Sequence, residues 1–122
     1  MIGLDTNVMI AWLLEGGKSR LPPAESFRVS HVVLVELHWA LTRRFKKSKP
    51  AAIAVLRRVL GASNVVIDRP EVVTAAIDDY DVGGADFNDF MIMRDNQFAG
   101  CRETLTLDQD AANKPGFKLL RS

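Results

Sequence analysis

The sequence has few of the residues on which disulfide-rich, zinc-finger and membrane proteins depend. Its 122 residues contain one cysteine, Cys101, so no disulfide can form within the chain, which fits a reducing compartment. The two histidines, His31 and His38, lack zinc-ligand spacing with that cysteine. No apolar run approaches the roughly 20 residues that span a bilayer, and no basic, apolar leader opens the sequence. These absences predict a cytoplasmic protein with no membrane partner.

Repeats and low-complexity segments are also missing from the sequence. Apolar residues make up 48% and charged residues 25%, which is ordinary for a globular protein and excludes a disordered or collagen-like chain. A chain of this length should bury about two-thirds of its unfolded surface, and no linker divides it. We therefore expect one domain over residues 1–122.

Acidic residues are absent from one long stretch of the chain, although the net charge is only +1. Residues 37–67 contain seven basic residues and no acidic one, whereas residues 68–110 contain eleven acidic residues and three basic ones. An acidic region attracts cations and a basic region attracts phosphates. The small net charge is therefore a near-cancellation, and it does not exclude a nucleic-acid partner.

Short apolar segments alternate with segments of helical periodicity along the whole chain. This alternation predicts an α/β fold with a parallel sheet, right-handed crossovers and helices on both faces. The predicted strands are 1–4, 27–29, 64–67, 104–107 and 118–120, and the predicted helices are 7–15, 31–46, 51–60, 70–80 and 86–97.

Several residues are typical of helix boundaries. Ser30 can cap the helix over 31–46, because its hydroxyl can accept a hydrogen bond from an unpaired backbone N–H. Pro50 suits a first helical turn, and Asp68 with Pro70 opens the next predicted helix. The pair Gly83–Gly84 should end that helix.

Carboxylates follow two of the predicted strands directly. Asp5 comes after the strand over 1–4, and Asp108 comes after the strand over 104–107. Ligands of parallel sheets collect beyond the carboxyl ends of the strands. If these two strands are neighbours, the two carboxylates converge, although they lie near opposite ends of the sequence.

Three further carboxylates are candidates for the same site. Asp86 and Asp89 are three residues apart on one predicted helix and share a face. Glu36 lies in an apolar helical stretch, where a charge needs a partner or a metal. Converging carboxylates repel one another, and a divalent cation resolves that conflict. Oxygen ligands alone select Mg²⁺ or Mn²⁺.

Four segments together resemble the motifs of PIN domains, in the order that the family has them. They are Met1-Ile2-Gly3-Leu4-Asp5-Thr6-Asn7-Val8, Val33-Leu34-Val35-Glu36-Leu37, Gly84-Ala85-Asp86-Phe87-Asn88-Asp89-Phe90 and Thr104-Leu105-Thr106-Leu107-Asp108. The size of the chain is similar to that of VapC-type toxins from toxin–antitoxin pairs. The resemblance implies a three-layer α/β/α fold with a central parallel sheet of four to five strands. It also implies a Mg²⁺-dependent ribonuclease, usually a homodimer, that a cognate antitoxin holds inactive, with Mn²⁺ able to replace Mg²⁺.

The resemblance also implies a role for each matched residue. Its acidic positions fall on Asp5, Glu36, Asp89 and Asp108, the expected catalytic residues. Metal binding is expected of Asp5, Asp89 and Asp108, with Asp86 as an additional or alternative ligand. Glu36 is expected to be a ligand or an acceptor that orients the metal-bound water, and Asp110 could also contribute. The polar residues that would hold these carboxylates are Thr6, Asn7 and Thr106. The basic residues expected to contact RNA phosphates are Arg43, Arg44, Lys46 and Lys47.

Other interpretations stay open for some of these residues. Asp86 could serve as a helix N-cap, and the basic run could be a helix end favoured by the helix dipole. Arg94 could pair with a nearby acid or contact substrate. A PIN-like module that binds RNA or protein without cutting is a second function. A signalling receiver domain is disfavoured, because Thr6-Asn7 follows Asp5 where receivers have a second acid, and no lysine follows the strand over 104–107.

Overall fold

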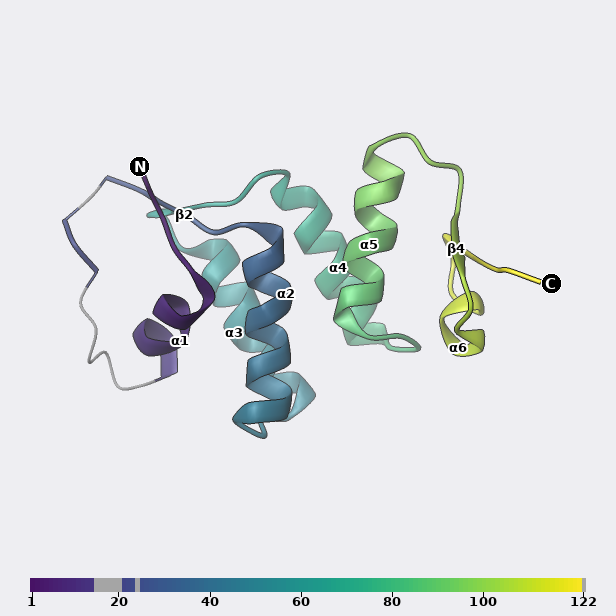
Figure 1. Cartoon of the computed structure of the whole chain (residues 1–122), viewed down its shortest axis with the longest axis horizontal. Helices are drawn as coiled ribbons and strands as arrows, with labels where there is room; N and C mark the ends of the chain where they lie inside the picture. Colours follow the sequence, from purple (N-terminus) through teal and green to yellow (C-terminus); the bar gives the residue numbers. More distant parts are fainter. Residues whose placement is uncertain (15–20, 24, 122) are drawn as a thin grey trace. The chain divides into compact units, whose positions relative to one another are not determined.

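The computed structural model describes residues 1–14, 21–23 and 25–121, in two compact units. The first unit is Met1–Asp68 and the second is Arg69–Ser122. Each unit combines α-helices with a small parallel sheet (Figure 1). The predicted α/β class and parallel strand pairing are therefore confirmed. The described strands form one sheet of three strands and one of two, and a single sheet of four to five strands is not among them.

The sheet of the first unit has the order β1-β2-β3, with all strands parallel. These strands are Ile2–Gly3, Phe27–Arg28 and Val65–Val66, each shorter than the sequence predicts. The hydrogen bond from the Leu4 N–H to the Arg28 carbonyl (2.9 Å) extends the pairing by one residue. Because β1 ends at Gly3, the chain leaves the sheet just before Asp5.

Three helices and a π-turn complete the first unit. They are α1 (Thr6–Leu14), α2 (His31–Trp39), η1 (Ala40–Arg44) and α3 (Lys49–Gly61). The predicted end of α1, residue 15, lies outside the described residues. Ser30 caps α2 as predicted, and its hydroxyl accepts from the Val33 N–H at 3.2 Å. Pro50 lies in the first turn of α3 as predicted.

The predicted helix over 31–46 differs from the structure in its last turn. After Trp39 the helix continues as η1, in which the Phe45 N–H bonds the Ala40 carbonyl at 2.9 Å. Lys46 then adopts a left-handed conformation with φ 54° and ends the element. A π-turn has one more residue than an α-turn, which shifts the helical face presented by the residues that follow it. Periodicity in the sequence does not reveal such an insertion.

The second unit begins with α4 (Pro70–Val82) and α5 (Phe87–Phe98), which pack against each other. Gly83 separates them with φ 106°, as the predicted glycine break requires. The residue before α4 is Arg69, whose side chain does not cap the helix, and Asp68 instead binds the Arg28 guanidinium at 2.8 Å. Asp68 therefore does not open α4 as predicted.

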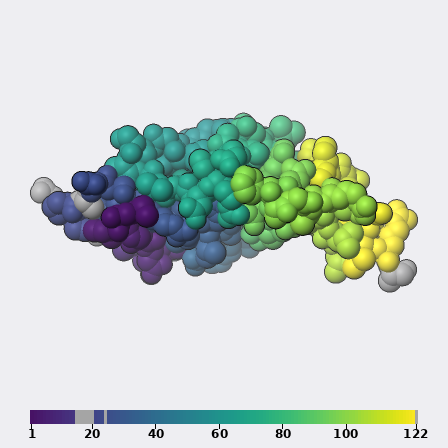
Figure 2. All heavy atoms as spheres, turned by 90° about the horizontal axis from the view of Figure 1, so that it is seen from above, coloured from purple at the N-terminus to yellow at the C-terminus, as the bar shows by residue number. Residues whose placement is uncertain are grey.

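The remaining elements of the second unit are β4 (Thr104–Thr106), α6 (Gln109–Ala112) and β5 (Phe117–Leu119). The strands pair in parallel with Thr104 opposite Phe117, and their residues lie side by side at the yellow end of the colour range (Figure 2). The single turn α6 connects the two strands and is absent from the sequence prediction, because four residues carry too little periodicity to reveal a helix.

Burial of apolar side chains stabilises each unit. Met9, Leu37 and Leu41 have no exposed surface in the first unit, nor do Ile77 and Phe87 in the second. Full burial of such a side chain contributes about 1.5–3 kcal/mol. None of the helices in the described ranges has both the length and the hydropathy that crossing a bilayer requires.

Candidate functional site

Thr6 makes a hydrogen bond to the carboxylate of Asp5 through its backbone and to that of Glu36 through its side chain. Asp5 lies between β1 and α1, and its Oδ1 accepts a hydrogen bond from the Thr6 N–H at 2.7 Å. The Thr6 Oγ1 donates to Glu36 Oε1, on α2, at 3.0 Å. Thr6 is only 9% exposed, whereas both acidic residues reach the surface. One buried residue therefore bonds two surface carboxylates, that of Asp5 through its backbone N–H and that of Glu36 through its hydroxyl.

These two carboxylates line one pocket of about 590 Å³ in the first unit. In the described part of the chain, neither Asp5 nor Glu36 forms an ion pair, although one guanidinium, that of Arg44, also lines the pocket. Pockets of this volume accommodate small ligands. The polar and aromatic residues around it are Asp5, Thr6, Asn7, Glu36, Trp39 and Arg44.

Asp86 and Asp89 form a capping box at the start of α5. The Asp86 Oδ1 accepts from the Phe87 N–H at 2.9 Å, and the Asp86 N–H donates to Asp89 Oδ2 at 3.2 Å. Such reciprocal bonds satisfy backbone donors that the first helical turn leaves unpaired. The interpretation of Asp86 as a helix N-cap is therefore confirmed, and Asp89 shares that structural role.

Asp108 caps the short helix α6. Its Oδ1 accepts from the Asp110 N–H at 2.8 Å and from the Ala111 N–H at 3.2 Å. The hydroxyl oxygen of Thr106 accepts from the Asp108 N–H at 3.0 Å. Thr106 thus holds the backbone of Asp108, whereas Thr6 contacts a carboxylate directly.

A second acidic pocket, of about 470 Å³, lies in the second unit. It contains Asp108 and Asp110, and the side chain of Lys114 also lines it. The Lys114 aliphatic chain covers Gly84, where a Cβ atom would lie 2.6 Å from Lys114 Cε. Gly84 also has φ +98°, so glycine suits this position for two reasons. The other residues around the pocket are Gly84, Ala85 and Asn113.

Lys114 is a site residue that sequence reasoning does not single out. Its ammonium belongs to a basic C-terminal stretch, and nothing in the spacing links it to Asp108. The turn of α6 brings it back toward the strand end, where the Lys114 N–H bonds the Ala111 carbonyl at 2.9 Å. A cation at this place offsets part of the negative charge in the pocket.

Arg94 pairs with Asp79, which answers one question that the sequence leaves open. The guanidinium binds both carboxylate oxygens, with Nε–Oδ2 at 2.6 Å and Nη2–Oδ1 at 2.8 Å. The hydrogen bonds to Asp79 are the main cause that raises the pKa of Arg94. A bidentate pair of this kind joins α4 to α5 and accounts for Arg94 without a substrate.

Burial raises the pKa of Tyr80, and the negative charge of Asp86 raises it further. Tyr80 is 7% exposed, and its ring lies 6.0 Å from that of Phe87. The side chain of Asp86 therefore acts electrostatically on the end of α4 as well as capping α5.

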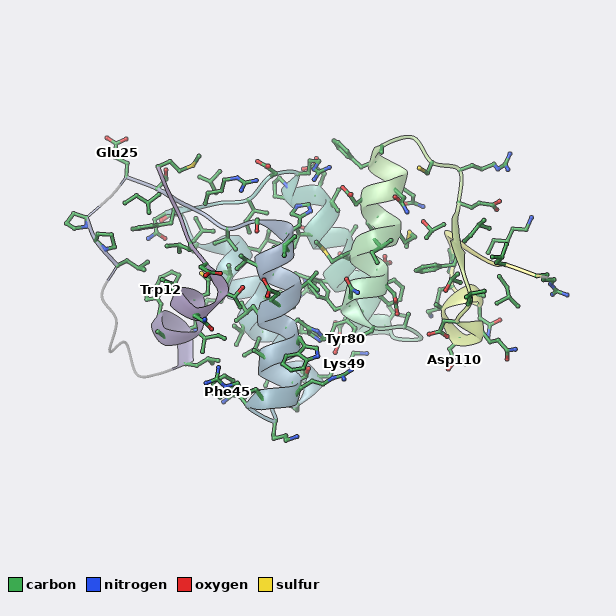
Figure 3. All side chains as sticks on the ribbon, in the orientation of Figure 1. Trp12, Glu25, Phe45, Lys49, Tyr80 and Asp110 are labelled. Carbon is green, nitrogen blue, oxygen red and sulfur yellow. The ribbon has the colours of Figure 1, made fainter. Side chains whose placement is uncertain are left out.

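The four basic residues predicted to contact RNA all lie at or after the end of η1 and are exposed. Arg44 lines the pocket of Asp5 and Glu36, and its guanidinium carbon lies 5.0 Å from the centre of the Phe45 ring. Phe45 is at the end of that helical segment (Figure 3). The remaining three, which the pocket does not include, are Arg43, Lys46 and Lys47.

The predicted acidic residues thus gather in pairs, each within one unit: Asp5 with Glu36, and Asp86 with Asp89. Asp108 shares its pocket with Asp110. Within the described ranges, no group of three or more Asp, Glu, His or Cys residues is positioned to hold a metal ion. Mg²⁺ commonly binds through one or two carboxylates, with water and substrate phosphates as its other ligands. Two hard-oxygen carboxylates in one open pocket fit that coordination.

Comparison with known proteins found no matching family model, no matching curated protein and no matching solved structure. The resemblance to PIN domains stays a prediction from four motifs. The geometry of the pockets is therefore the basis for assigning a function.

Proposed function

We propose that this chain is a Mg²⁺-dependent ribonuclease that hydrolyses RNA phosphodiester bonds and that a cognate antitoxin neutralises. The observation that carries the proposal is that Asp5 and Glu36 line one pocket and both accept hydrogen bonds from the buried Thr6, Asp5 from its backbone N–H and Glu36 from its hydroxyl. Two carboxylates in one open pocket are ligands that a hard divalent cation prefers. A cytoplasmic homodimer, and Mn²⁺ in place of Mg²⁺, belong to the same proposal.

The residues of the first unit have distinct roles in this proposal. Asp5 would hold the ion, and Glu36 would bind it or act as the acceptor that orients the metal-bound water. Thr6 fixes one Glu36 oxygen, Oε1, through its hydroxyl. Asn7 would hold the carboxylates through its amide. Mg²⁺ would supply polarisation of the scissile phosphate and activation of the water nucleophile.

The acidic residues of the second unit complete the proposed set. Asp89 and Asp108 take the remaining ligand positions, with Asp86 as an additional or alternative ligand. One oxygen of Asp89 and one of Asp108 accept backbone hydrogen bonds, and in the described structure the other oxygen of each has no hydrogen bond. A capping carboxylate therefore keeps one oxygen with which to bind a cation. Thr106 keeps Asp108 in place through its backbone.

The decisive experiment compares RNA cleavage by the wild-type chain and by Asp5→Asn, each with Mg²⁺ and with EDTA. We expect the wild type to cleave only with Mg²⁺ and Asp5→Asn to lose cleavage with its circular dichroism unchanged. Glu25→Gln is the matched control, because Glu25 is an exposed acid of the same unit that does not line the pocket (Figure 3). Full cleavage by Asp5→Asn would overturn the proposal.

One observation favours the second candidate, a module that binds RNA or protein without cutting. The carboxylates of Asp86, Asp89 and Asp108 all satisfy backbone N–H groups at helix starts, so a structural role already explains their presence. This candidate predicts RNA binding without Mg²⁺-dependent cleavage. The wild-type arm of the experiment above separates the two candidates directly.

We also propose the finer architecture, a three-layer fold with one central parallel sheet of four to five strands. The support comes from the hydrogen-bond pattern of parallel sheets, in which the N–H groups of alternate residues bond the same neighbouring strand. The N–H groups of Ile2 and Leu4 bond the segment of β2, and Thr104 and Thr106 bond that of β5. The N–H groups of Gly3 and Leu105 therefore face sheet edges that no described strand of their own unit covers. An unpaired strand edge is unfavourable unless another strand, a helix or a loop covers it.

Amide hydrogen exchange tests this architecture. If the single sheet forms, the Gly3 and Leu105 amides exchange as slowly as those of Leu4 and Thr104, because a strand covers each edge. If these two amides exchange like those of exposed loops, the sheets stay separate and the finer architecture is wrong.

A further inference from the structure

The side chain of Trp39 is an exposed aromatic surface beside the two carboxylates. Trp39 is the last residue of α2, three residues after Glu36, and lies on the same side of the helix. It is 57% exposed, lines the pocket of Asp5 and Glu36, and has no ring contact within the described part of the chain. An indole this exposed gains little by packing within the chain, and its face is available for a flat ligand to stack on at this polar pocket.

Arg44 reaches the same pocket because of the π-turn. On a regular α-helix, the face that carries Glu36 and Ala40 would continue to residue 43. The extra residue in the turn closed by the Phe45-to-Ala40 hydrogen bond shifts this face by one position, and Arg44 lines the pocket instead. The Phe45 ring under the guanidinium, at 5.0 Å, restricts its orientation.

We infer that Trp39 and Arg44 form a subsite for one nucleotide of single-stranded RNA, with the base stacked on the indole and a phosphate on the guanidinium. Every base has a π-face, and an aromatic platform beside a basic group is the common means of binding unpaired strands. Bases in an RNA duplex stack on one another and cannot reach such a platform. The subsite deepens the proposed function, on which it rests, by naming two residues that would bind the substrate.

The arrangement also accounts for two opposite charges in one pocket. A strand whose phosphate rests on Arg44 and whose base covers Trp39 would pass beside Asp5 and Glu36, the groups assigned to the ion. Arg44 would offset the repulsion between these carboxylates and the RNA backbone. The inference makes Trp39 and Arg44 binding residues of the substrate and leaves the chemical step to the carboxylates.

Fluorescence of a single tryptophan tests the stacking. The chain has two tryptophans, and Trp12 lies on α1 outside this pocket (Figure 3), so Trp12→Phe leaves Trp39 as the only reporter. In EDTA, where no cleavage competes, a short single-stranded RNA should quench this fluorescence, and the duplex with its complement should not. Absence of quenching, or equal quenching by the duplex, would overturn the inference.

Steady-state kinetics distinguish stacking from a structural role. We expect Trp39→Leu to raise the KM for single-stranded RNA by about tenfold or more with a small change in kcat, and Trp39→Phe to restore most of it, since the ring can still stack. Arg44→Ala should reduce the salt dependence of binding, whereas Arg58→Ala, an exposed charge of the same unit outside this pocket, should not. An unchanged KM in Trp39→Leu would contradict the subsite.

The outcomes separate this inference from the proposed function. If Asp5→Asn abolishes cleavage while Trp39→Leu keeps the wild-type KM, the ribonuclease stands and the subsite fails. If Asp5→Asn cleaves as the wild type does while RNA still quenches Trp39, the subsite stands as an RNA-binding site and the assigned chemistry fails.

Discussion

The two units use their carboxylates in different ways. In the first unit, the carboxylate of Glu36 is held by a side chain from another element, that of Thr6, and shares its pocket with Asp5. In the second unit, Asp86 and Asp108 bind backbone N–H groups of the helices that they begin. A carboxylate that caps its own helix has a local reason to be there. A carboxylate that tertiary contacts hold at an open pocket has no such local role. The pocket of the first unit is therefore the stronger evidence for a bound ligand.

Substitution of two threonines tests this comparison with the largest expected effect, because both threonines are predicted to hold carboxylates. Thr6→Val removes the hydroxyl that binds Glu36 and keeps the side-chain volume, so we expect RNA cleavage to fall by about ten- to hundredfold. Thr106→Val removes an oxygen that accepts only from the Asp108 N–H, and its effect should be smaller. Cleavage rates under identical Mg²⁺ concentrations measure both. Equal losses would mean that the contact to a carboxylate has no special importance.

Serine substitutions separate capping from chemistry in the second unit. Serine caps helices about as well as aspartate but has no negative charge, whereas alanine does not cap. Asp108→Ala should therefore lower the free energy of unfolding by about 1 kcal/mol and Asp108→Ser by much less, as urea unfolding would report. Under the proposed function, Asp108→Ser still loses cleavage. If Asp108→Ser keeps both stability and cleavage, the carboxylate serves the helix alone.

The same pair of changes applies to Asp86, with a smaller expected effect on cleavage, since Asp86 is proposed as an additional or alternative ligand. Asp86→Ala should destabilise α5 by about 1 kcal/mol, and Asp86→Ser should restore most of that loss. A large loss of cleavage in Asp86→Ser at unchanged stability would show that Asp86 is a required ligand.

The smallest expected effect is on the titration of Tyr80. Its signal can be assigned directly, because Tyr80 is the only tyrosine in the chain. Burial and the charge of Asp86 raise its pKa above the ordinary value of 10.0. The unfolded chain then releases this proton at a lower pH than the folded chain does, so the free energy of unfolding falls as the pH rises above about 10. Tyrosinate absorbance should titrate above that of the free amino acid, and Tyr80→Phe should lose the signal. A normal titration would contradict the burial of this hydroxyl.

Much of the local structure follows from the sequence. The positions of Ser30, Pro50 and Gly83 correctly predict where helices begin or end, and the strand and helix alternation correctly predicts the α/β class with parallel pairing. The misses are local as well. The π-turn over Ala40–Arg44 adds a residue without a signal in composition, and α6 is too short for periodicity to reveal it.

The candidate site likewise contains residues that the sequence identifies and residues that only the structure identifies. The sequence points to Asp5, Glu36 and Thr6 through motifs, and the cap at Asp86 through its position before a helix. It does not point to Lys114, which the turn of α6 brings to Asp108, or distinguish Arg44 from Arg43. Both depend on where a turn directs a side chain, and motif spacing does not include that information.

The sequence by itself determined several helix boundaries, the charge segregation and the acidic residues worth testing. Those properties depend on hydrogen bonds and periodicities that span three or four residues, so the types of neighbouring residues are enough to predict them. Only the tertiary structure decided that the Thr6 hydroxyl joins α1 to Glu36, and that Trp39 and Arg44 share their pocket. Contacts between distant elements depend on how packed surfaces fit together, and no local pattern specifies that fit.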